Sequence, residues 1–190
     1  MTFISSSQAA EQAILNAAHL IVAAVTTAPK ARGVSNLSAA ILQGEEKDRL
    51  AQAMEEHQLR KRRKLDFILR DATNIRQATV VILIGVKGTQ PKKPESPLNC
   101  GACGYATCAL FMAAEKRKGE DFQGPLCAFQ VLDLGIALGV AAKMASELNI
   151  DNRLMYSAGA GARDLGYLEA DLVIALPLSV SPKNIFFDRP

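Results

Sequence analysis

The chain has no tryptophan, few other aromatic residues and a net charge of only +3. Residues 1–7 contain neither a basic segment nor a signal-cleavage pattern, so we do not expect export to an oxidising compartment. The small net charge gives no strong attraction to nucleic acid or to a membrane surface. Charged residues are missing from 12–29, but polar side chains there argue against a membrane span. We therefore expect a cytoplasmic protein without a nucleic-acid or membrane partner.

Length and composition indicate a single domain with an insertion. The chain has 190 residues, of which 49% are hydrophobic, enough to bury a full core. A connector rich in proline and lysine, Lys87 to Pro97, leads into the only segment that contains cysteine. We expect the core to comprise residues 1–90 and 128–190, and the inserted segment to comprise residues 91–127.

The four cysteines are Cys100, Cys103, Cys108 and Cys127. Their C-x2-C-x4-C-x18-C spacing lets three thiolates converge from one loop while the fourth returns after a helix-length excursion, as a cubane iron-sulfur cluster requires. Glycine directly follows two of them and allows the positive φ angles with which a backbone wraps around a cluster. We expect Cys108 to begin a helix, whose positive end favours a thiolate.

Two other interpretations of these cysteines stay open. Disulfides suit secreted chains, for which the N-terminal residues give no indication. Structural zinc is the stronger alternative, because four thiolates make a good tetrahedral site. Zinc sites usually pair two short C-x2-4-C motifs, however, and here the second pair is interrupted by a long gap. The spacing favours an iron-sulfur cluster over zinc.

Hydrophobic periodicity predicts alternating helices and strands. A helix capped by Ser5 to Ser7 should reach about Thr26, and a charged helix after Gly44 should reach about Leu59. The remaining expected elements are a strand or helical turn at 37–42, a helix around 65–72, a buried strand at 79–86, a long helix at 128–149, a short strand at 153–157 and a last strand at 171–177.

Several charged or polar residues need interpretation. The basic run 60–64 is either a solvated helix face or a docking patch for an acidic partner or nucleic acid, and no interleaved aromatic residues support the patch. We expect His19 to be partly buried on a helix, His57 to be solvated and Asp133 to be an exposed or capping carboxylate. No Ser-His-Asp triad is indicated. The segment from Ser157 to Asp164 superficially suggests a dinucleotide loop, but Asp164 replaces its third glycine.

The segment from Asn99 to Cys108, taken together with Cys127, resembles the small 4Fe-4S domain of corrinoid iron-sulfur proteins and of membrane electron-transport complex B subunits. All four ligands and both glycines match over about 35 residues. The resemblance implies a 4Fe-4S cluster bound by the four cysteines.

The flanks resemble nitroreductase-like flavoproteins, in the loop from Ala28 to Asn36 and in the succession of long helix, turn, helix and strand between 133 and 177. This resemblance implies an α+β fold, a mixed sheet with packed helices, and a homodimer with FMN at its interface. It places FMN contacts at Lys30, Arg32, Asn36 and Lys183, with Arg189 as a further cation. The chain lacks the basic Arg-x-Ser segment with which those enzymes hold the flavin phosphate, because residues 1–7 contain no basic residue.

Over nearly its whole length, including 151–156 and 183–189, the chain resembles a family known only as uncharacterised ferredoxin-domain-containing proteins. We expect electron transfer through the 4Fe-4S cluster to a flavin or to a redox partner protein. If the protein is an enzyme, the resemblance implies an FMN-dependent, nitroreductase-like oxidoreductase. The alternative is a non-enzymatic scaffold or sensor without flavin, in which a cluster or a four-cysteine zinc site is structural.

Overall fold

The central strand of the sheet is β2 (Val80–Val86), a run of aliphatic residues that is buried over its whole length. It pairs antiparallel with β1 (Leu37–Leu42) on one side and with β6 (Leu172–Ser179) on the other. The short β5 (Asp151–Asn152) pairs antiparallel with β6, so the strand order is β1-β2-β6-β5. This computed structural model describes residues 3–187. The predicted α+β class is confirmed.

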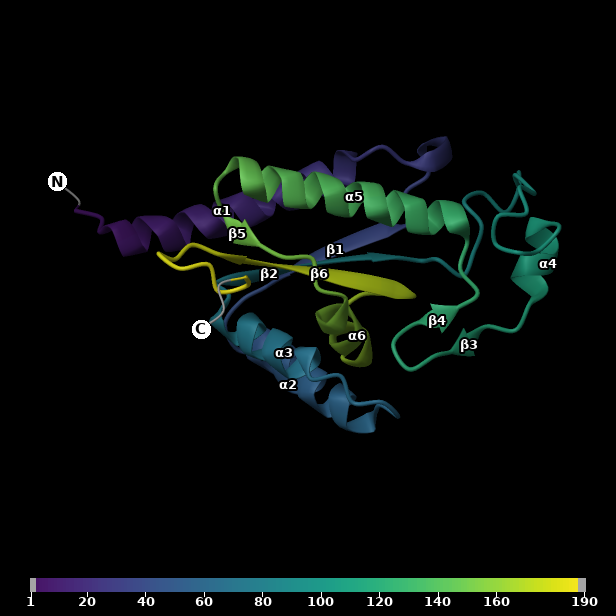
Figure 1. Cartoon of the computed structure of the whole chain (residues 1–190). Helices are drawn as coiled ribbons and strands as arrows, with labels where there is room; N and C mark the ends of the chain where they lie inside the picture. Colours follow the sequence, from purple (N-terminus) through teal and green to yellow (C-terminus); the bar gives the residue numbers. More distant parts are fainter. Residues whose placement is uncertain (1–2, 188–190) are drawn as a thin grey trace.

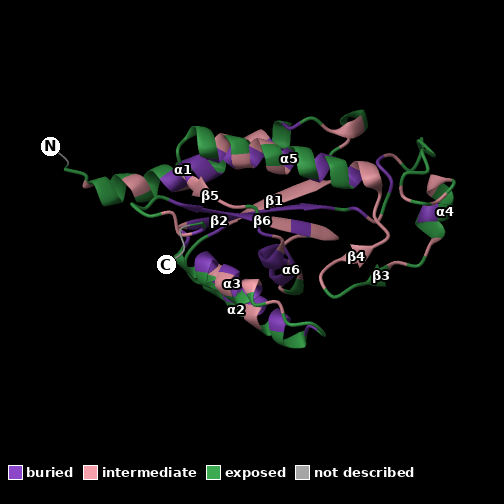
Figure 2. Cartoon of the chain, in the orientation of Figure 1, coloured by how far each residue is buried: buried purple, intermediate pink, exposed green. Residues whose placement is uncertain are grey.

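Helices cover both faces of the sheet (Figure 1). Ile82 and Ile84 of β2 point toward one helical layer, whereas Val81 and Leu83 point toward the other, as the two-residue period of a strand requires. Figure 2 shows the buried residues gathered along the sheet and the helix sides that face it. Each fully buried aliphatic side chain stabilises the fold by about 1.5–3 kcal/mol. The first layer consists of α1 (Ser6–Thr27) and α5 (Ala128–Glu147), and the second of α2 (Glu45–Arg60), α3 (Phe67–Gln77) and α6 (Tyr156–Asp164).

Local chemistry explains where the helices begin. Ser5 caps α1 through its hydroxyl, which accepts a hydrogen bond from the Gln8 N–H, and the Gln8 side chain accepts one from the Ser5 N–H. In α2, acidic residues occupy the first turn and Arg60 the last, so both ends complement the helix dipole. These two helices confirm the predicted starts.

Between β2 and α5 the chain leaves the sheet and forms the cysteine segment. It contains α4 (Cys108–Ala113) and a two-stranded hairpin of β3 (Arg117–Lys118) and β4 (Gln123–Gly124). Figure 1 places these elements beyond one end of the sheet, and Figure 2 shows that most of their residues are exposed or half-buried. The segment therefore depends on the core for its position.

The glycine-rich stretch predicted as a weak dinucleotide loop is helical, and forms α6. Its residues from Ser157 to Ala162 are all buried between the sheet and α2. A Cβ atom at Gly159 would lie 1.7 Å from the Val173 carbonyl oxygen of β6. The glycines therefore allow close packing of a helix on a strand. The strand predicted at 153–157 is also wrong, because β5 ends at Asn152 and α6 begins at Tyr156.

Two helices, α1 and α5, are long and apolar enough to cross a membrane by length and composition alone. In the structure they pack against each other and against the sheet, where Ile21 and Leu134 are buried. Their inner sides belong to the protein core, and their outer sides are exposed (Figure 2).

We predict that Gly159→Ala lowers the free energy of unfolding by about 3 kcal/mol, because the added methyl group overlaps backbone that cannot move aside. Gly161→Ala is the matched control in the same helix, since its methyl group meets first the flexible Met54 side chain at 2.9 Å. Urea unfolding should show a loss about 2 kcal/mol smaller for the control. Equal losses would contradict this account of α6 packing.

Candidate functional site

The loop that carries the first three cysteines is tightly turned. Asn99, Gly101 and Gly104 adopt positive φ angles of 48°, 73° and 86°. The Gly104 N–H donates to the Gly101 carbonyl at 2.9 Å. The Asn99 side-chain oxygen accepts a hydrogen bond from the Cys108 N–H at 2.8 Å, and Cys108 begins α4 as predicted. The loop is therefore closed by its own polar groups and places Cys108 at a helix start.

The fourth cysteine is held by the end of the central strand. Cys127 precedes α5, and its N–H donates to the Gly88 carbonyl at 2.8 Å, just past β2. One helical turn later, the buried Gln130 side chain donates to the Gln90 carbonyl at 3.3 Å. These contacts fasten the end of the cysteine segment to the core.

Three of the four cysteines, Cys100, Cys108 and Cys127, line one cavity; Cys103 is half-buried in the same loop. Three cations, Arg32, Lys92 and Lys93, also line the cavity, and none of its described lining residues is acidic. All four cysteines are free thiols, so the disulfide alternative finds no support. Within residues 3–187, no three Cys, His, Asp or Glu side chains meet closely enough to hold one metal ion.

Asp133 contradicts the prediction of an exposed or capping carboxylate, because only 1% of its surface is exposed. One carboxylate oxygen accepts a hydrogen bond from the Ala31 N–H at 2.9 Å, and the other pairs with the Lys92 ammonium, which is equally buried. A buried charge is stable only when it is paired and hydrogen-bonded. Lys92 lines the cysteine cavity, so this ion pair joins α5 to the cysteine segment.

The residues predicted to contact FMN do not gather at one place. Lys30 donates to the Thr26 and Ala28 carbonyls, both at 2.7 Å, and thereby stabilises the end of α1. Arg32 is hydrogen-bonded to Ser96 and lines the cysteine cavity. Lys183 is exposed in the C-terminal tail, which Figure 1 places at the other end of the sheet from 28–36.

Asn36 differs from the other three residues, because its buried side-chain nitrogen has no hydrogen-bond partner among the described residues. A buried donor without a protein partner costs free energy unless water or a ligand accepts its hydrogen bond. Arg189 lies outside the described residues. The FMN contacts remain a prediction.

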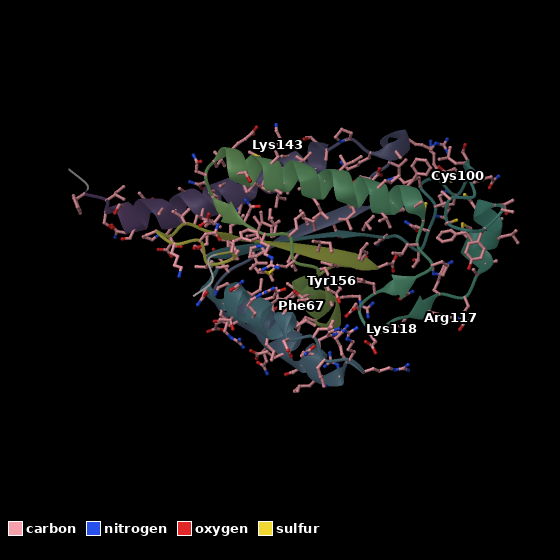
Figure 3. All side chains as sticks on the ribbon, in the orientation of Figure 1. Phe67, Cys100, Arg117, Lys118, Lys143 and Tyr156 are labelled. Carbon is pink, nitrogen blue, oxygen red and sulfur yellow. The ribbon has the colours of Figure 1, made fainter. Side chains whose placement is uncertain are left out.

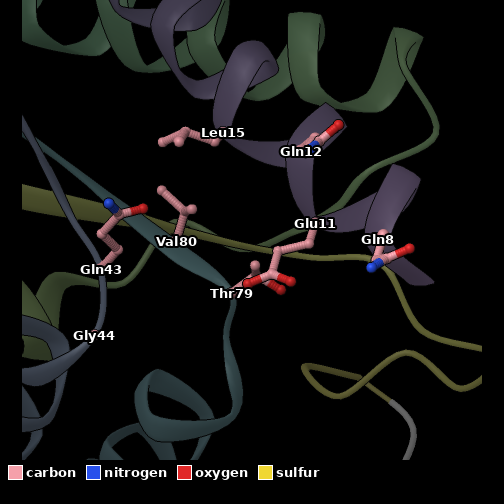
Figure 4. Close-up of a pocket in the computed structure, with 8 residues that line it drawn as sticks. All are labelled: Gln8, Glu11, Gln12, Leu15, Gln43, Gly44, Thr79 and Val80. Atoms are coloured by element: carbon pink, nitrogen blue, oxygen red, sulfur yellow. The ribbon is translucent and has the colours of Figure 1, made fainter. Parts of the chain in front are cut away.

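A larger cavity of about 530 Å³ lies between α1 and the start of β2 (Figure 4). Gln8, Glu11 and Gln12 of α1 face Gln43 and Thr79 across it. Its described lining residues include one carboxylate and no lysine or arginine. A flavin phosphate needs cationic or backbone donors, so this cavity does not suit one.

A polar network, which the sequence did not reveal, joins the β3–β4 hairpin to the core. His57 is 4% exposed, contrary to the prediction of a solvated histidine. Its Nε2 lies 2.7 Å from Asp121 of the hairpin loop, and its Nδ1 lies 2.8 Å from Asp164 at the end of α6. Asp121 also accepts hydrogen bonds from Lys61 and from the Tyr156 hydroxyl. His19, predicted to be partly buried, is exposed.

The network holds its carboxylates in the charged form. Burial by itself would raise the pKa of Asp121, but hydrogen bonds from Lys61, His57 and Tyr156 outweigh it and lower that pKa below its usual value. Burial would also raise the pKa of Asp164, but the hydrogen bond with His57 outweighs it and lowers that pKa. A lowered carboxyl pKa stabilises the fold above about pH 4, and that contribution is lost as pH falls through the folded-state pKa.

We predict that Asp121→Asn lowers the free energy of unfolding at pH 7 by about 2 kcal/mol, because the buried Lys61 loses its charged partner. The difference from wild type should narrow below about pH 4, where the wild-type carboxylate also becomes protonated. Urea unfolding between pH 7 and pH 3 measures both effects. Glu115→Gln, in an exposed pair with Arg117, is the control and should change little. If the loss in free energy of unfolding is the same at pH 3 and at pH 7, the charge of Asp121 does not stabilise the fold.

Comparison with known proteins adds to this geometry. A family model described as "Uncharacterized protein containing a ferredoxin domain" matches residues 123–189. An uncharacterised protein of Archaeoglobus fulgidus is 42% identical over 173 residues, which cover 91% of this chain and 90% of the relative.

Among solved structures, the similarity lies in the fold. An FMN-bound nitroreductase of Desulfitobacterium hafniense has a TM-score of 0.53 and 12% identity, with 96% of this chain and 81% of that chain covered. A BluB-like flavoprotein of Clostridium difficile has a TM-score of 0.55 and 14% identity, with 100% and 85% covered. The predicted nitroreductase-like fold is therefore confirmed. The chain belongs to the family of uncharacterised proteins that contain a ferredoxin domain.

Proposed function

We propose that this protein is an iron-sulfur redox protein that passes single electrons through a 4Fe-4S cluster bound by Cys100, Cys103, Cys108 and Cys127. The observation that carries the proposal is the cysteine cavity, whose described lining includes three of these cysteines and three cations and no acid. A cluster bound by four thiolates carries net negative charge, and nearby cations stabilise its reduced form. The ferredoxin domain of the family supports the same role.

The donor set fits such a cluster better than it fits zinc. A zinc ion draws four sulfurs to about 2.3 Å from one point, whereas a four-iron cluster keeps its ligands further apart. The cavity measures about 20 Å³, so the exposed loop that carries Cys100 would have to move to admit a cluster. The positive φ angles of Asn99, Gly101 and Gly104 let this loop wrap closely around a bound group.

In this role the protein supplies position and charge, and the cluster supplies one-electron chemistry when bound. Cys127 would hold it against the end of β2, because the Cys127 N–H is bonded to Gly88. Lys92, which lines the cysteine cavity, is held there by its ion pair with Asp133. Free thiols of this kind suit a reducing compartment, so a cytoplasmic location stays part of the proposal.

We predict that the protein, purified without oxygen, contains about four irons and four sulfides per chain and bleaches on reduction by dithionite. Cys108→Ser and Cys127→Ser should each lose more than about half of the iron, because a serine hydroxyl is a poor ligand for iron at this position. Iron and sulfide assays, absorbance and electron paramagnetic resonance measure these outcomes.

Ala109→Ser is the matched control, because it adds a hydroxyl next to Cys108 without removing a thiolate. It should retain the cluster. One zinc per chain without sulfide in strictly anaerobic protein would reject the redox proposal. That result would instead favour the alternative function, a scaffold or sensor with a structural metal site.

We also propose that the protein is a homodimer that covers the outer side of α5. Leu132, Gly135, Ile136 and Gly139 follow the i, i+3, i+4, i+7 spacing of one helix face. The two large residues of this stripe are 57% and 44% exposed, and a Cβ atom at either glycine would meet open space. Small residues let another helix approach closely, so a second copy could bury the stripe.

The flavin proposal depends on this dimer, because the nitroreductase resemblance implies FMN at the subunit interface. Asn36, with its orphaned donor, supports it. Lys30 and Arg32 do not support it, because Lys30 donates to a backbone carbonyl and Arg32 donates to Ser96. Flavin-dependent oxidoreductase activity is therefore the second candidate function.

We predict that Ile136→Glu converts a dimer to a monomer, because a charge in an apolar interface must be desolvated. The amount of bound FMN, measured by its visible absorbance, should fall together with the fraction of dimer. Leu154→Glu is the control, at a similarly exposed leucine outside the stripe. A monomeric wild-type protein in analytical ultracentrifugation would contradict the proposed dimer. A dimer that contains no flavin would contradict the proposed FMN binding and leave the dimer proposal intact.

A further inference from the structure

Two basic runs that lie far apart in the sequence meet beside the cysteine segment. One follows α2 at 60–64, and the other is at 116–118 in and before β3. Glu120 and Asp121 of the hairpin loop join them, because both carboxylates pair with Lys61. A hollow at this junction is lined by residues of both runs, among them Arg60 and Lys118. The fold thus concentrates cations that the sequence separates.

Three of these cations have structural roles. Lys61 is 7% exposed and is held by Asp121. Lys64 donates to the Gln58 carbonyl at 3.2 Å at the end of α2. Lys116 donates to the Phe111 carbonyl and lies 4.3 Å from the centre of the Phe111 ring. They stabilise the fold and are not available to a partner.

The remaining five cations are exposed, and one of them, Arg60, also pairs with Asp164 at 2.5 Å. We call them the basic surface: Arg60, Arg62, Arg63, Arg117 and Lys118. The Arg62 and Arg117 side chains are 97% and 81% exposed, and their pairs with Glu120 and Glu115 are weak for that reason. Within residues 3–187, neither Arg63 nor Lys118 has an ion-pair partner. The eight cations of the two runs outnumber the four acids that pair with them, Glu115, Glu120, Asp121 and Asp164, so this region is positive on balance.

The basic surface adjoins the cysteine loop. Arg117 and Lys118 line a hollow of about 500 Å³ together with Tyr105, which lies in the loop between Cys103 and Cys108. The Tyr105 ring packs edge-on against Phe111 with centroids 5.9 Å apart. Figure 3 places Cys100, Arg117 and Lys118 at the same end of the molecule, and Lys143 away from them over its middle. A partner seated on the basic surface would therefore lie close to the proposed cluster.

We propose that the basic surface docks an acidic electron-carrier protein. The inference rests on the proposed function and names the partner class of that site. One electron leaves the reduced carrier and enters the cluster bound by the cysteines, so the carrier is oxidised by one electron and no bond forms or breaks. Carriers of this kind form small, transient interfaces, in which opposite charge speeds encounter more than it strengthens binding.

The composition of the surface favours a protein over nucleic acid. Proteins that bind single strands alternate cations with aromatic side chains on which bases stack. The run 60–64 contains no aromatic residue. Two aromatic residues line the hollow, Tyr105 and Phe122, and both are half-buried and packed edge-on against other rings, those of Phe111 and Tyr156. Charge without stacking suits an acidic protein surface.

The test measures how fast the oxidised protein accepts electrons from a reduced, strongly acidic bacterial-type ferredoxin in stopped-flow experiments. Arg62→Glu and Lys118→Glu should each slow this rate about threefold at low salt, and the double variant about tenfold. High salt should slow wild type toward the variants. Arg49→Glu is the matched control, since it makes the same charge change on an exposed cation near the start of α2, at the opposite end of that helix from the basic surface. It should retain the wild-type rate.

A second reductant separates the two proposals. Photoreduced 5-deazariboflavin is small and needs no docking surface, so it should reduce wild type and all variants equally. If it reduces none of them, the proposed redox function fails. If it reduces all of them while the ferredoxin rate is unchanged by Lys118→Glu and by salt, the docking inference is overturned. Binding of a fluorescent RNA oligonucleotide that the same variants abolish, with ferredoxin rates unchanged, would assign the surface to nucleic acid.

Discussion

The cysteine site depends on one buried ion pair, between Asp133 and Lys92. Removing two charges from water costs several kcal/mol per ion, and only close pairing with further hydrogen bonds offsets that cost. Asp133 meets this requirement through Lys92 and the Ala31 N–H. In doing so it joins three segments: the loop after α1, the connector that enters the cysteine segment, and the helix that follows Cys127. Both ends of the segment are thereby brought to one point on α5.

The far side of the cysteine segment has a second anchor in Asp121. This carboxylate gathers His57, Lys61 and Tyr156, and His57 reaches on to Asp164. Between the two anchors the loop that carries Cys100 stays exposed. A segment with fixed ends and a free middle can close around a cluster without disturbing the core. The same arrangement turns the hairpin cations outward, where an approaching protein would meet them.

Local signals made much of the fold predictable. The Ser5 cap, the apolar run of β2 and the long apolar helix α5 were read correctly, because each depends on neighbours within a few residues. The α+β, nitroreductase-like class was implied by the resemblance of 28–36 and 133–177 to those flavoproteins. The errors share one cause, which is that a partner distant in sequence changes what a residue does. His57 and Asp133 looked like solvent-exposed side chains because their partners lie 64, 107, 41 and 102 residues away. The one sequence feature that pointed to a buried Asp133 was its position inside a helix of apolar residues.

The amino-acid sequence by itself determined the set of four thiols and most of the helices and strands. Four thiols at cluster spacing and alternating apolar patterns are properties of the chain that hold before it folds. Tertiary structure alone decided three features. The small residues of α6 pack closely on β6, Asp133 and Asp121 anchor the cysteine segment, and the two basic runs form one surface. Those outcomes depend on close packing and on charges paired across the fold, and such contacts exist only once distant segments are brought together and water is excluded between them.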